Sequence, residues 1–290
     1  MKISFLGLGT MGWPMAANLL AAGYDLRAWN RSPEPGQRLA ARGAHIASSP
    51  REAVRDADVV ILILADDAAT RSTLQAADEA LRPGAIVVNM ATVSAELSAG
   101  LAADFAGRGI RYVAAPVLGR VDVAEAGELN ILAAGEAAAI DAVQPLFDVM
   151  GRKTWRYGER PEQASVVKLA VNFMIASAIG AMGEAAALVR GHGVDAADFL
   201  GLVTSTGFAS PVYQGYGSAI ADERFTPAGF RLALGLKDVN LAIAAAEQAR
   251  VPLTLASTVR DAIIEGLAHG DGDLDFAALA RTSARRAGQA

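Results

Sequence analysis

The sequence predicts an α/β protein with an N-terminal doubly wound sheet and a C-terminal all-α domain, joined by a long central helix. In the first half, short β-rich runs alternate with helical patterns, the arrangement that crossover connections in a parallel sheet require. From residue 164 to 189 the chain is apolar nearly all round and contains no proline, and the segments beyond have helical patterns. We therefore expect one domain over residues 1–161 and a second over residues 162–290.

The individual elements follow from local patterns. Expected strands are short apolar or β-branched runs bounded by glycine, proline or polar residues, at 3–6, 24–29, 59–64, 85–90, 112–115, 129–133 and 153–157. Expected helices of the second half lie at 164–189, 196–203, 235–248, 253–266 and 276–281. The Gly/Ser/Pro-rich stretch around 208–216 is expected to connect helices, and 285–290 to form a frayed tail.

Composition excludes several classes of function. With 26 basic and 31 acidic residues the net charge is −5, so there is no electrostatic case for a nucleic-acid or membrane partner. Cysteine is absent, which excludes disulfides, thiolate metal sites and cysteine nucleophiles, and three dispersed histidines suggest no metal cluster. No continuous apolar run reaches the roughly 18 residues of a membrane span, and the N-terminus resembles a buried strand rather than a signal peptide. We expect a cytoplasmic protein.

A glycine-rich turn lies between the first expected strand and the first helix. Its pattern is G-x-G-x-x-G, formed by Gly7, Leu8, Gly9, Thr10, Met11 and Gly12. The first glycine permits the tight turn, the second lets the backbone approach a pyrophosphate, and the third lets helix and strand pack closely. The helix N-terminus adds free N–H groups and the positive end of its dipole. The turn predicts a Rossmann-type dinucleotide site.

The end of the second expected strand bears on which dinucleotide binds. A site for NAD normally places Asp or Glu there to bind the ribose hydroxyls, whereas this chain has Asn30, Arg31 and Ser32. An arginine attracts a 2′-phosphate, and the two neighbouring side chains can donate hydrogen bonds to it. We predict NADP(H) as the preferred cofactor, with NAD(H) possible. The alternative is an ordinary polar turn with a solvated arginine.

Two polar residues interrupt the apolar central helix. Lys168 and Asn172 are four residues apart, so both project from one face. Polar groups in such a stretch are costly unless they meet water, a ligand or each other. A functional interpretation competes with one in which the lysine extends to solvent and the asparagine satisfies a neighbouring backbone group. The adjacent carboxylates Asp66 and Asp67 are expected to be a solvated turn.

Over essentially its whole length the chain resembles the β-hydroxyacid dehydrogenases, which include 3-hydroxyisobutyrate dehydrogenase, tartronate semialdehyde reductase and the glyoxylate/succinic semialdehyde reductases. Five motifs in order carry the resemblance: Gly-Leu-Gly-Thr-Met-Gly-Trp-Pro-Met-Ala-Ala-Asn-Leu at 7–19, Asn-Met-Ala-Thr-Val-Ser at 89–94, Ala-Pro-Val-Leu-Gly at 115–119, Lys168-x-x-x-Asn172, and Lys237-Asp238.

The resemblance implies a role for each matched residue. Lys168 matches the catalytic lysine, and Asn172 matches its partner in orienting the substrate. Positions that line the ribose and nicotinamide are matched by Leu64, Ala65 and Thr92. Lys237 matches a lysine that reaches over the cofactor, with Asp238 on the substrate side helping to hold it. The loop that anchors the substrate carboxylate is matched by Val117, Leu118, Gly119 and Arg120.

Two departures from the family pattern affect the expected substrate. The family usually has Ser-Gly-Gly after Pro-Val, so Leu118 replaces a hydroxyl and Arg120 replaces a glycine. Backbone amides of the loop can still bind a carboxylate, and the arginine either reinforces that binding, reshapes the pocket or points to solvent. A second, milder departure is Val171, where many relatives carry another asparagine.

The resemblance implies hydride transfer between NADPH and a small carboxylate-bearing aldehyde or keto acid, of the glyoxylate, succinic semialdehyde or tartronate semialdehyde class. Lys168 would stabilise the charge that develops on the carbonyl oxygen and act as general acid or base. The alternatives are an NAD-dependent dehydrogenase of the 3-hydroxyisobutyrate type, an imine reductase and a non-catalytic NADPH-binding scaffold. The very apolar helical domain predicts a homodimer or homotetramer.

Overall fold

The strands of the first unit are apolar runs that a parallel sheet buries on both faces. In the computed structural model, which describes residues 1–289, β1, β4 and β5 are buried at every position. The strands are β1 (Ile3–Leu6), β2 (Leu26–Trp29), β3 (His45–Ile46), β4 (Val59–Leu62), β5 (Ile86–Asn89), β6 (Arg111–Ala114), β7 (Val117–Leu118), β8 (Leu129–Gly135) and β9 (Gly151–Arg156). They form one nine-stranded sheet in the order β3-β2-β1-β4-β5-β6-β8-β7, with β9 paired to β8.

The direction of the strands changes along this sheet. The six strands from β3 to β6 run parallel, whereas β8 is antiparallel to both β6 and β7 and parallel to β9. Strand order reverses between β1 and β4, because β2 and β3 lie on one side of β1 and the later strands on the other. In doubly wound folds this switch point opens a crevice at the carboxyl ends of the strands.

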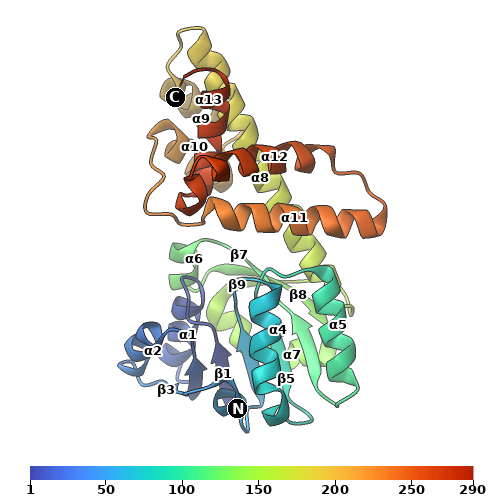
Figure 1. Ribbon diagram of the computed structural model, residues 1–290. Coiled ribbons are helices and arrows are strands. Elements are labelled where there is room, and N and C mark those ends of the chain that lie inside the picture. The colour runs from blue at the N-terminus through green and yellow to red at the C-terminus, as the bar shows by residue number, and fades with distance from the viewer. Residues whose placement is uncertain (290) are drawn as a thin grey trace. The chain divides into compact units, whose positions relative to one another are not determined.

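Helices cover both faces of the sheet (Figure 1). One core cluster joins the sheet to α1 (Gly12–Ala21), α2 (Pro33–Ala40), α6 (Val121–Glu125) and α7 (Ala137–Met150). The cluster on the opposite face joins it to α3 (Pro50–Val54), α4 (Asp67–Ala77), the short 3-10 turn η1 (Asp78–Ala80) and α5 (Ala95–Ala106). The prediction of a doubly wound α/β sheet is confirmed.

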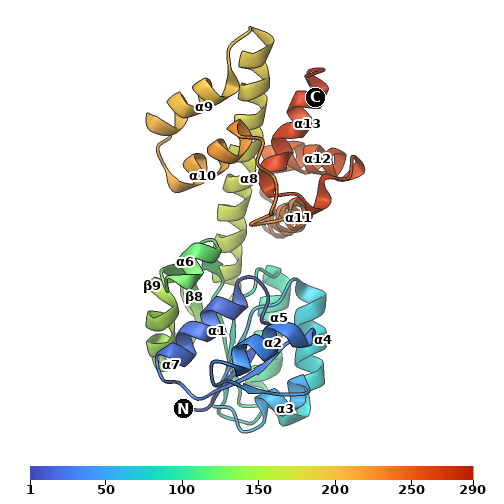
Figure 2. The ribbon, with the colours of Figure 1, turned by 90° about the vertical axis from the view of Figure 1, so that its left-hand side faces the viewer.

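The second unit is helical. The chain divides after Lys168, inside α8 (Glu162–Gly191), whereas the boundary expected from the sequence lies where that helix begins. The remaining elements are α9 (Ala196–Ser205), α10 (Pro211–Ala221), α11 (Leu232–Ala249), α12 (Thr254–Ala268), η2 (Asp271–Asp273), η3 (Phe276–Ala278) and α13 (Leu279–Arg286). Figure 2 shows α9 and α10 on one side of α8 and α11 to α13 on the other. The predicted long central helix and all-α domain are confirmed.

Glycine permits close packing on α8. A Cβ atom on Gly183 would lie 2.7 Å from the Cα atom of Ala280, in the first turns of α13. The two helices therefore approach closely at this position.

The central helix is also long and apolar enough to cross a membrane, by length and composition alone. Its 30 residues contain an 18-residue window of mean hydropathy 1.7, of which 28% is buried. Charged residues such as Lys168 and Glu184 interrupt the apolar run, so no continuous run of 18 apolar residues occurs in α8, and core helices of soluble proteins pass the same hydropathy test.

Several expected boundaries need correction. The strands β3 and β7 have two residues each and were not predicted, and α10 occupies the stretch expected to be a connection. The predicted helix at 276–281 is the 3-10 turn η3 followed by α13. The expected tail is helical as far as Arg286, and Arg285 pairs at 2.7 Å with buried Asp271; residue 290 lies outside the described residues.

Candidate active site

The glycine-rich turn links β1 directly to α1. Gly7 has a φ of +99°, and a Cβ atom there would lie 2.3 Å from the carbonyl oxygen of Ile63. A Cβ atom on Gly12 would lie 2.0 Å from the carbonyl oxygen of Gly7, so both positions exclude a side chain. Around Gly9 the reverse holds, because nothing lies within 4 Å of its Cβ position. The turn is thus closed on its inner side and open at its second glycine.

The open side of the turn presents hydrogen-bond donors. Among the residues that the structure describes, the backbone N–H groups of Gly9, Thr10 and Met11 have no acceptor within the protein. No side chain caps α1 at Met11, and the first turn carries no acidic residue. Free amides and the positive end of a helix dipole suit a pyrophosphate. The residues present therefore fit a bound dinucleotide.

Asn30 has a structural role in addition to the one predicted. Its Oδ1 accepts from the Leu8 amide at 2.9 Å, and its Nδ2 donates to the Ser32 carbonyl at 2.9 Å. Leu8 is 1% exposed, so its amide has no access to water and needs this acceptor. Asn30 thereby ties the glycine turn to the end of β2. Because Nδ2 has a second N–H, donation to a 2′-phosphate stays a prediction.

Arg31 and Ser32 are both exposed between β2 and α2, where the adenosine end of a dinucleotide lies in this fold. The first carboxylate after β2 is Glu34 in the first turn of α2, a position that complements the helix dipole. The charge nearest to the strand end is therefore positive.

The remaining predicted cofactor residues follow the two strands beyond β1. Leu64 and Ala65 lie between β4 and α4, and Thr92 lies between β5 and α5. The registers Leu6–Leu62 and Leu62–Asn89 place the carboxyl ends of β1, β4 and β5 side by side. The predicted turns therefore line one edge of the sheet, in the order in which an extended dinucleotide would meet them.

Asp66 and Asp67 are structural rather than solvated. Asp66 caps α4 by accepting from the Ala69 amide at 2.8 Å. The Asp67 carboxylate accepts from the amide of Ser94 at 2.9 Å and from its hydroxyl at 2.5 Å. This bond joins the turn after β4 to the turn that contains Thr92, so the sequence interpretation of the pair was wrong.

The predicted substrate loop crosses from β7 into α6. Val117 is buried and Leu118, which is half-buried, lies opposite Asn130 of β8. Gly119 adopts a φ of +147°, which disfavours a side chain, and its Cβ position lies 2.7 Å from the side chain of Leu129. Arg120 is exposed at the N-terminus of α6.

Lys168 lies in the second turn of α8 and is half-buried. Just before it, Ala164 is fully buried and Val167 packs against the same core cluster as Leu64 and Leu118. The structure thus places the first turns of α8 against the core that also carries the turn after β4 and the substrate loop.

Within the helical unit, three predicted residues form one polar group. Asn172 Nδ2 donates to Asp238 Oδ2 at 2.5 Å, and Lys237 Nζ lies 3.0 Å from Asp238 Oδ1. Asp238 is 4% exposed, whereas the Lys237 side chain is 22% exposed. Among the described residues, the buried carboxylate thus accepts one hydrogen bond, at Oδ2, while its Oδ1 atom lies within ion-pair distance of the ammonium but accepts no hydrogen bond. These residues were predicted from the sequence, but the hydrogen bond from the asparagine to the carboxylate was not.

Comparisons with known proteins agree with this arrangement. Residues 2–158 match the model of the NAD binding domain of 6-phosphogluconate dehydrogenase, and residues 163–283 match that of the NAD-binding domain of NADP-dependent 3-hydroxyisobutyrate dehydrogenase. The chain is 41% identical over 282 residues to the uncharacterized oxidoreductase YfjR of Bacillus subtilis, covering 96% of this chain and 98% of that protein. The chain belongs to the β-hydroxyacid dehydrogenase family.

Two further relatives of this dehydrogenase have assigned activities. Glyoxylate/succinic semialdehyde reductase 1 of Arabidopsis thaliana is 32% identical, over 96% of this chain and 97% of its own length. A solved structure of 3-hydroxyisobutyrate dehydrogenase from Mycobacterium tuberculosis with L-serine has a TM-score of 0.87 and 29% identity, covering 97% of this chain and 98% of that one. The chain is thus an NAD(P)-dependent oxidoreductase, as predicted.

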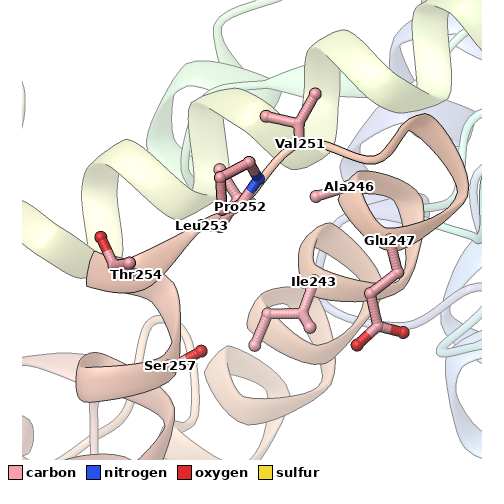
Figure 3. Close-up of a pocket in the computed structure, with 8 residues that line it drawn as sticks. All are labelled: Ile243, Ala246, Glu247, Val251, Pro252, Leu253, Thr254 and Ser257. Atoms are coloured by element: carbon pink, nitrogen blue, oxygen red, sulfur yellow. The ribbon is translucent and has the colours of Figure 1, made fainter.

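One pocket of the dehydrogenase lies in the helical unit, apart from the predicted site residues. It encloses about 240 Å³ between the end of α11 and the start of α12, and Figure 3 shows its lining residues. Its lining is mainly apolar, with the Glu247 carboxylate at its side, and includes none of the predicted site residues. An acidic rim disfavours a carboxylate substrate, so this pocket is not a candidate for the substrate site.

Proposed function

We propose that the dehydrogenase is an NADPH-dependent reductase of small carbonyl compounds that bear a carboxylate, of the glyoxylate, succinic semialdehyde or tartronate semialdehyde class. The observation that carries the cofactor preference is the exposed Arg31 directly after β2, where an NAD site would place a carboxylate. The similarity to the Arabidopsis glyoxylate/succinic semialdehyde reductase supports the substrate class.

The chemistry then divides between the cofactor and the chain. A bound reduced nicotinamide supplies the hydride. The Lys168 ammonium stabilises the negative charge that develops on the carbonyl oxygen and donates the proton that completes the alcohol. Its position at the edge of a shared apolar core lowers the local dielectric and strengthens that interaction.

Asn172 orients the substrate through its amide. One N–H of Nδ2 is bound to the buried Asp238 carboxylate, so the amide plane is held and the remaining N–H and the Oδ1 atom point away from that bond. A carboxylate-bearing substrate needs donors, and the amides of the loop that contains Leu118 and Gly119 are the candidates that the resemblance supplies. Arg120 adds a positive charge at the same loop.

A substrate panel tests this proposal. Short aldehyde acids, keto acids, uncharged aldehydes and imines are offered with NADPH and NADH in parallel. We expect the highest kcat/KM with an aldehyde acid and NADPH. Lys168→Ala should lower kcat by a factor on the order of 10² to 10⁴, the contribution of a general acid, and leave the Kd for NADPH within about twofold. Turnover that survives in this variant would remove the lysine from the chemistry, and faster reduction of imines would reassign the substrate class.

We also propose that the protein is a homo-oligomer. On α8, one helical stripe is exposed and almost entirely apolar: Ala170, Met174, Ala181 and Leu188, with Glu184 as its only charge. Met174 is 68% exposed and Leu188 is 64% exposed. A second copy that packs against this stripe would remove it from water, which accounts for an apolar helix that has an exposed face in one chain.

A further inference from the structure

A chain of buried polar side chains crosses the sheet unit from β5 to α8. Asn89 Nδ2 donates to the Tyr112 hydroxyl at 3.0 Å, and the hydroxyls of Ser98 and Ser165 are 2.8 Å apart. The Ser98 side chain also adjoins the Tyr112 phenol, whose pKa it lowers, and this links the two pairs. All four residues are at most 5% exposed. They come from β5, β6, α5 and α8, and the bonded serines are 67 residues apart in sequence.

Each end of this chain leads to a part of the proposed active site. At one end, Asn89 Oδ1 accepts from the Ala91 amide at 3.0 Å, in the turn that carries Thr92. At the other end, Ser165 lies three residues before Lys168, on the same side of α8. Because an α-helix moves as a rigid element over one turn, a displacement of Ser165 is passed on to Lys168.

Polar side chains at these buried positions require an explanation, because apolar ones could occupy them. The chain crosses a core in which Phe105, Leu132 and Ala164 are at most 2% exposed, and apolar side chains of similar volume would fill that space without desolvating any hydroxyl. Apolar contacts permit small slides and rotations, whereas a fully bonded polar network allows one arrangement. Burial raises the pKa of Tyr112 to about 12 against the opposing effect of its bonds to Ser98 and Asn89, so its phenol remains neutral at physiological pH.

We propose that Asn89, Tyr112, Ser98 and Ser165 are positioning residues, which set the depth and rotation of the first turns of α8 so that Lys168 meets the carbonyl oxygen beside the turn that contains Thr92. The inference rests on the proposed function, because it assigns a reaction geometry to Lys168. None of the four side chains touches substrate in this scheme; each acts through the next.

The experiment measures hydride transfer directly. Single-turnover oxidation of NADPH by the substrate that the wild-type protein reduces fastest is compared in Ser165→Ala and Tyr112→Phe. We expect each variant to slow the transfer by roughly tenfold or more, since a misplacement of about 1 Å costs up to about 10²-fold. The Kd for NADPH should stay within about twofold. Ser165→Thr, which restores a hydroxyl, should recover most of the rate.

The matched control is Ser4→Ala in the middle of β1. The Ser4 hydroxyl is also fully buried, but it has no hydrogen-bond partner among the described residues, so its removal breaks no bond. We expect wild-type transfer rates in this variant. A slowdown equal to that of Ser165→Ala would overturn the proposal, because any buried serine would then have the same effect.

A second readout separates this proposal from the proposed function. Amide hydrogen exchange over 163–168 and 90–94 should quicken by about tenfold in Ser165→Ala and stay unchanged in Ser4→Ala. Should the wild-type protein reduce no carbonyl compound, the proposed function fails, and the exchange result alone then decides whether the network holds α8. Unchanged exchange in Ser165→Ala and Tyr112→Phe, or unchanged transfer rates in an active enzyme, would refute the positioning role.

Discussion

The separate tasks of Asn30 and Arg31 yield three variants with different binding signatures. Arg31→Ala removes a positive charge that is exposed to solvent, and it breaks no bond that ties the glycine turn to β2. A hydrogen bond to a charged group contributes about 1.5–3 kcal/mol, and solvent screening places this one in the lower half of that range. The Kd for NADPH should therefore rise by about 10- to 30-fold, whereas the Kd for NADH should change by less than about threefold.

Asn30→Ala acts on both cofactors. The variant removes the acceptor of the Leu8 amide, which is buried, and an unsatisfied buried amide costs about 1–3 kcal/mol. Because that cost falls on the turn that binds the pyrophosphate, the affinities for NADPH and NADH should drop by the same factor. Asn30→Asp keeps the acceptor but adds a negative charge, so it should weaken NADPH and spare NADH.

Titration of cofactor fluorescence at fixed ionic strength measures all of these constants. Repetition at higher salt should reduce the advantage of NADPH over NADH in the wild-type protein and leave Arg31→Ala almost unaffected. If Arg31→Ala lowered the affinities for NADPH and NADH by the same factor, the arginine would not recognise a 2′-phosphate. If Asn30→Ala weakened the binding of NADPH but not that of NADH, the bond from Leu8 to Asn30 would not shape the turn.

Three further outcomes are expected. Asp238→Ala leaves the Asn172 amide and the Lys237 ammonium without their buried partner. Because the ammonium can still reach water, we expect the free energy of unfolding to fall by about 3 kcal/mol and Tm to fall by roughly 6–12 °C. An unchanged Tm would contradict a stabilising role of this ion pair. The pKa of Tyr112 in the folded protein is about 12, against an ordinary 10. Its contribution to the free energy of unfolding is therefore present below pH 10 and is lost as the pH rises through 12. Chemical denaturation should show that the free energy of unfolding declines more steeply over this range in the wild-type protein than in Tyr112→Phe. Leu188→Glu should convert the oligomer to a smaller species in light scattering, and an unchanged mass would exclude this stripe as the interface.

Local chemistry explains what the sequence could predict. The strand at Ile3–Leu6 is mainly apolar, and the Gly7 and Gly12 positions that follow it have no room for a side chain. Helix α8 was predictable because 30 residues without proline admit hardly any other structure. In each case the information lies within one turn or strand, so the pattern and the fold agree.

Non-local chemistry explains the failures. The two-residue strands β3 and β7 exist because longer neighbours offer them hydrogen-bonding partners, and no pattern in two residues announces a strand. Arg285 belongs to α13 because it pairs with Asp271, which is 3% exposed. An exposed terminal arginine and a half-buried, paired one are identical in sequence.

In the predicted site, too, local features could be predicted from the sequence and contacts between distant residues could not. The spacing of Lys168 and Asn172 placed both on one face of a helix, and that inference needed only the helical period. The bond from Asn172 to Asp238 spans 66 residues, and a sequence offers no measure of that distance. The bond shows that the asparagine donates to a buried carboxylate rather than to a neighbouring backbone group, and its role in orienting the substrate stays a prediction. A carboxylate accepts hydrogen bonds and never donates them, so it selects the N–H side of the amide and leaves Oδ1 facing elsewhere. Replacement of Asp238 by Asn would remove the preference for the N–H side, because an amide both donates and accepts hydrogen bonds. The Asn172 amide could then rotate by half a turn and still keep a hydrogen bond.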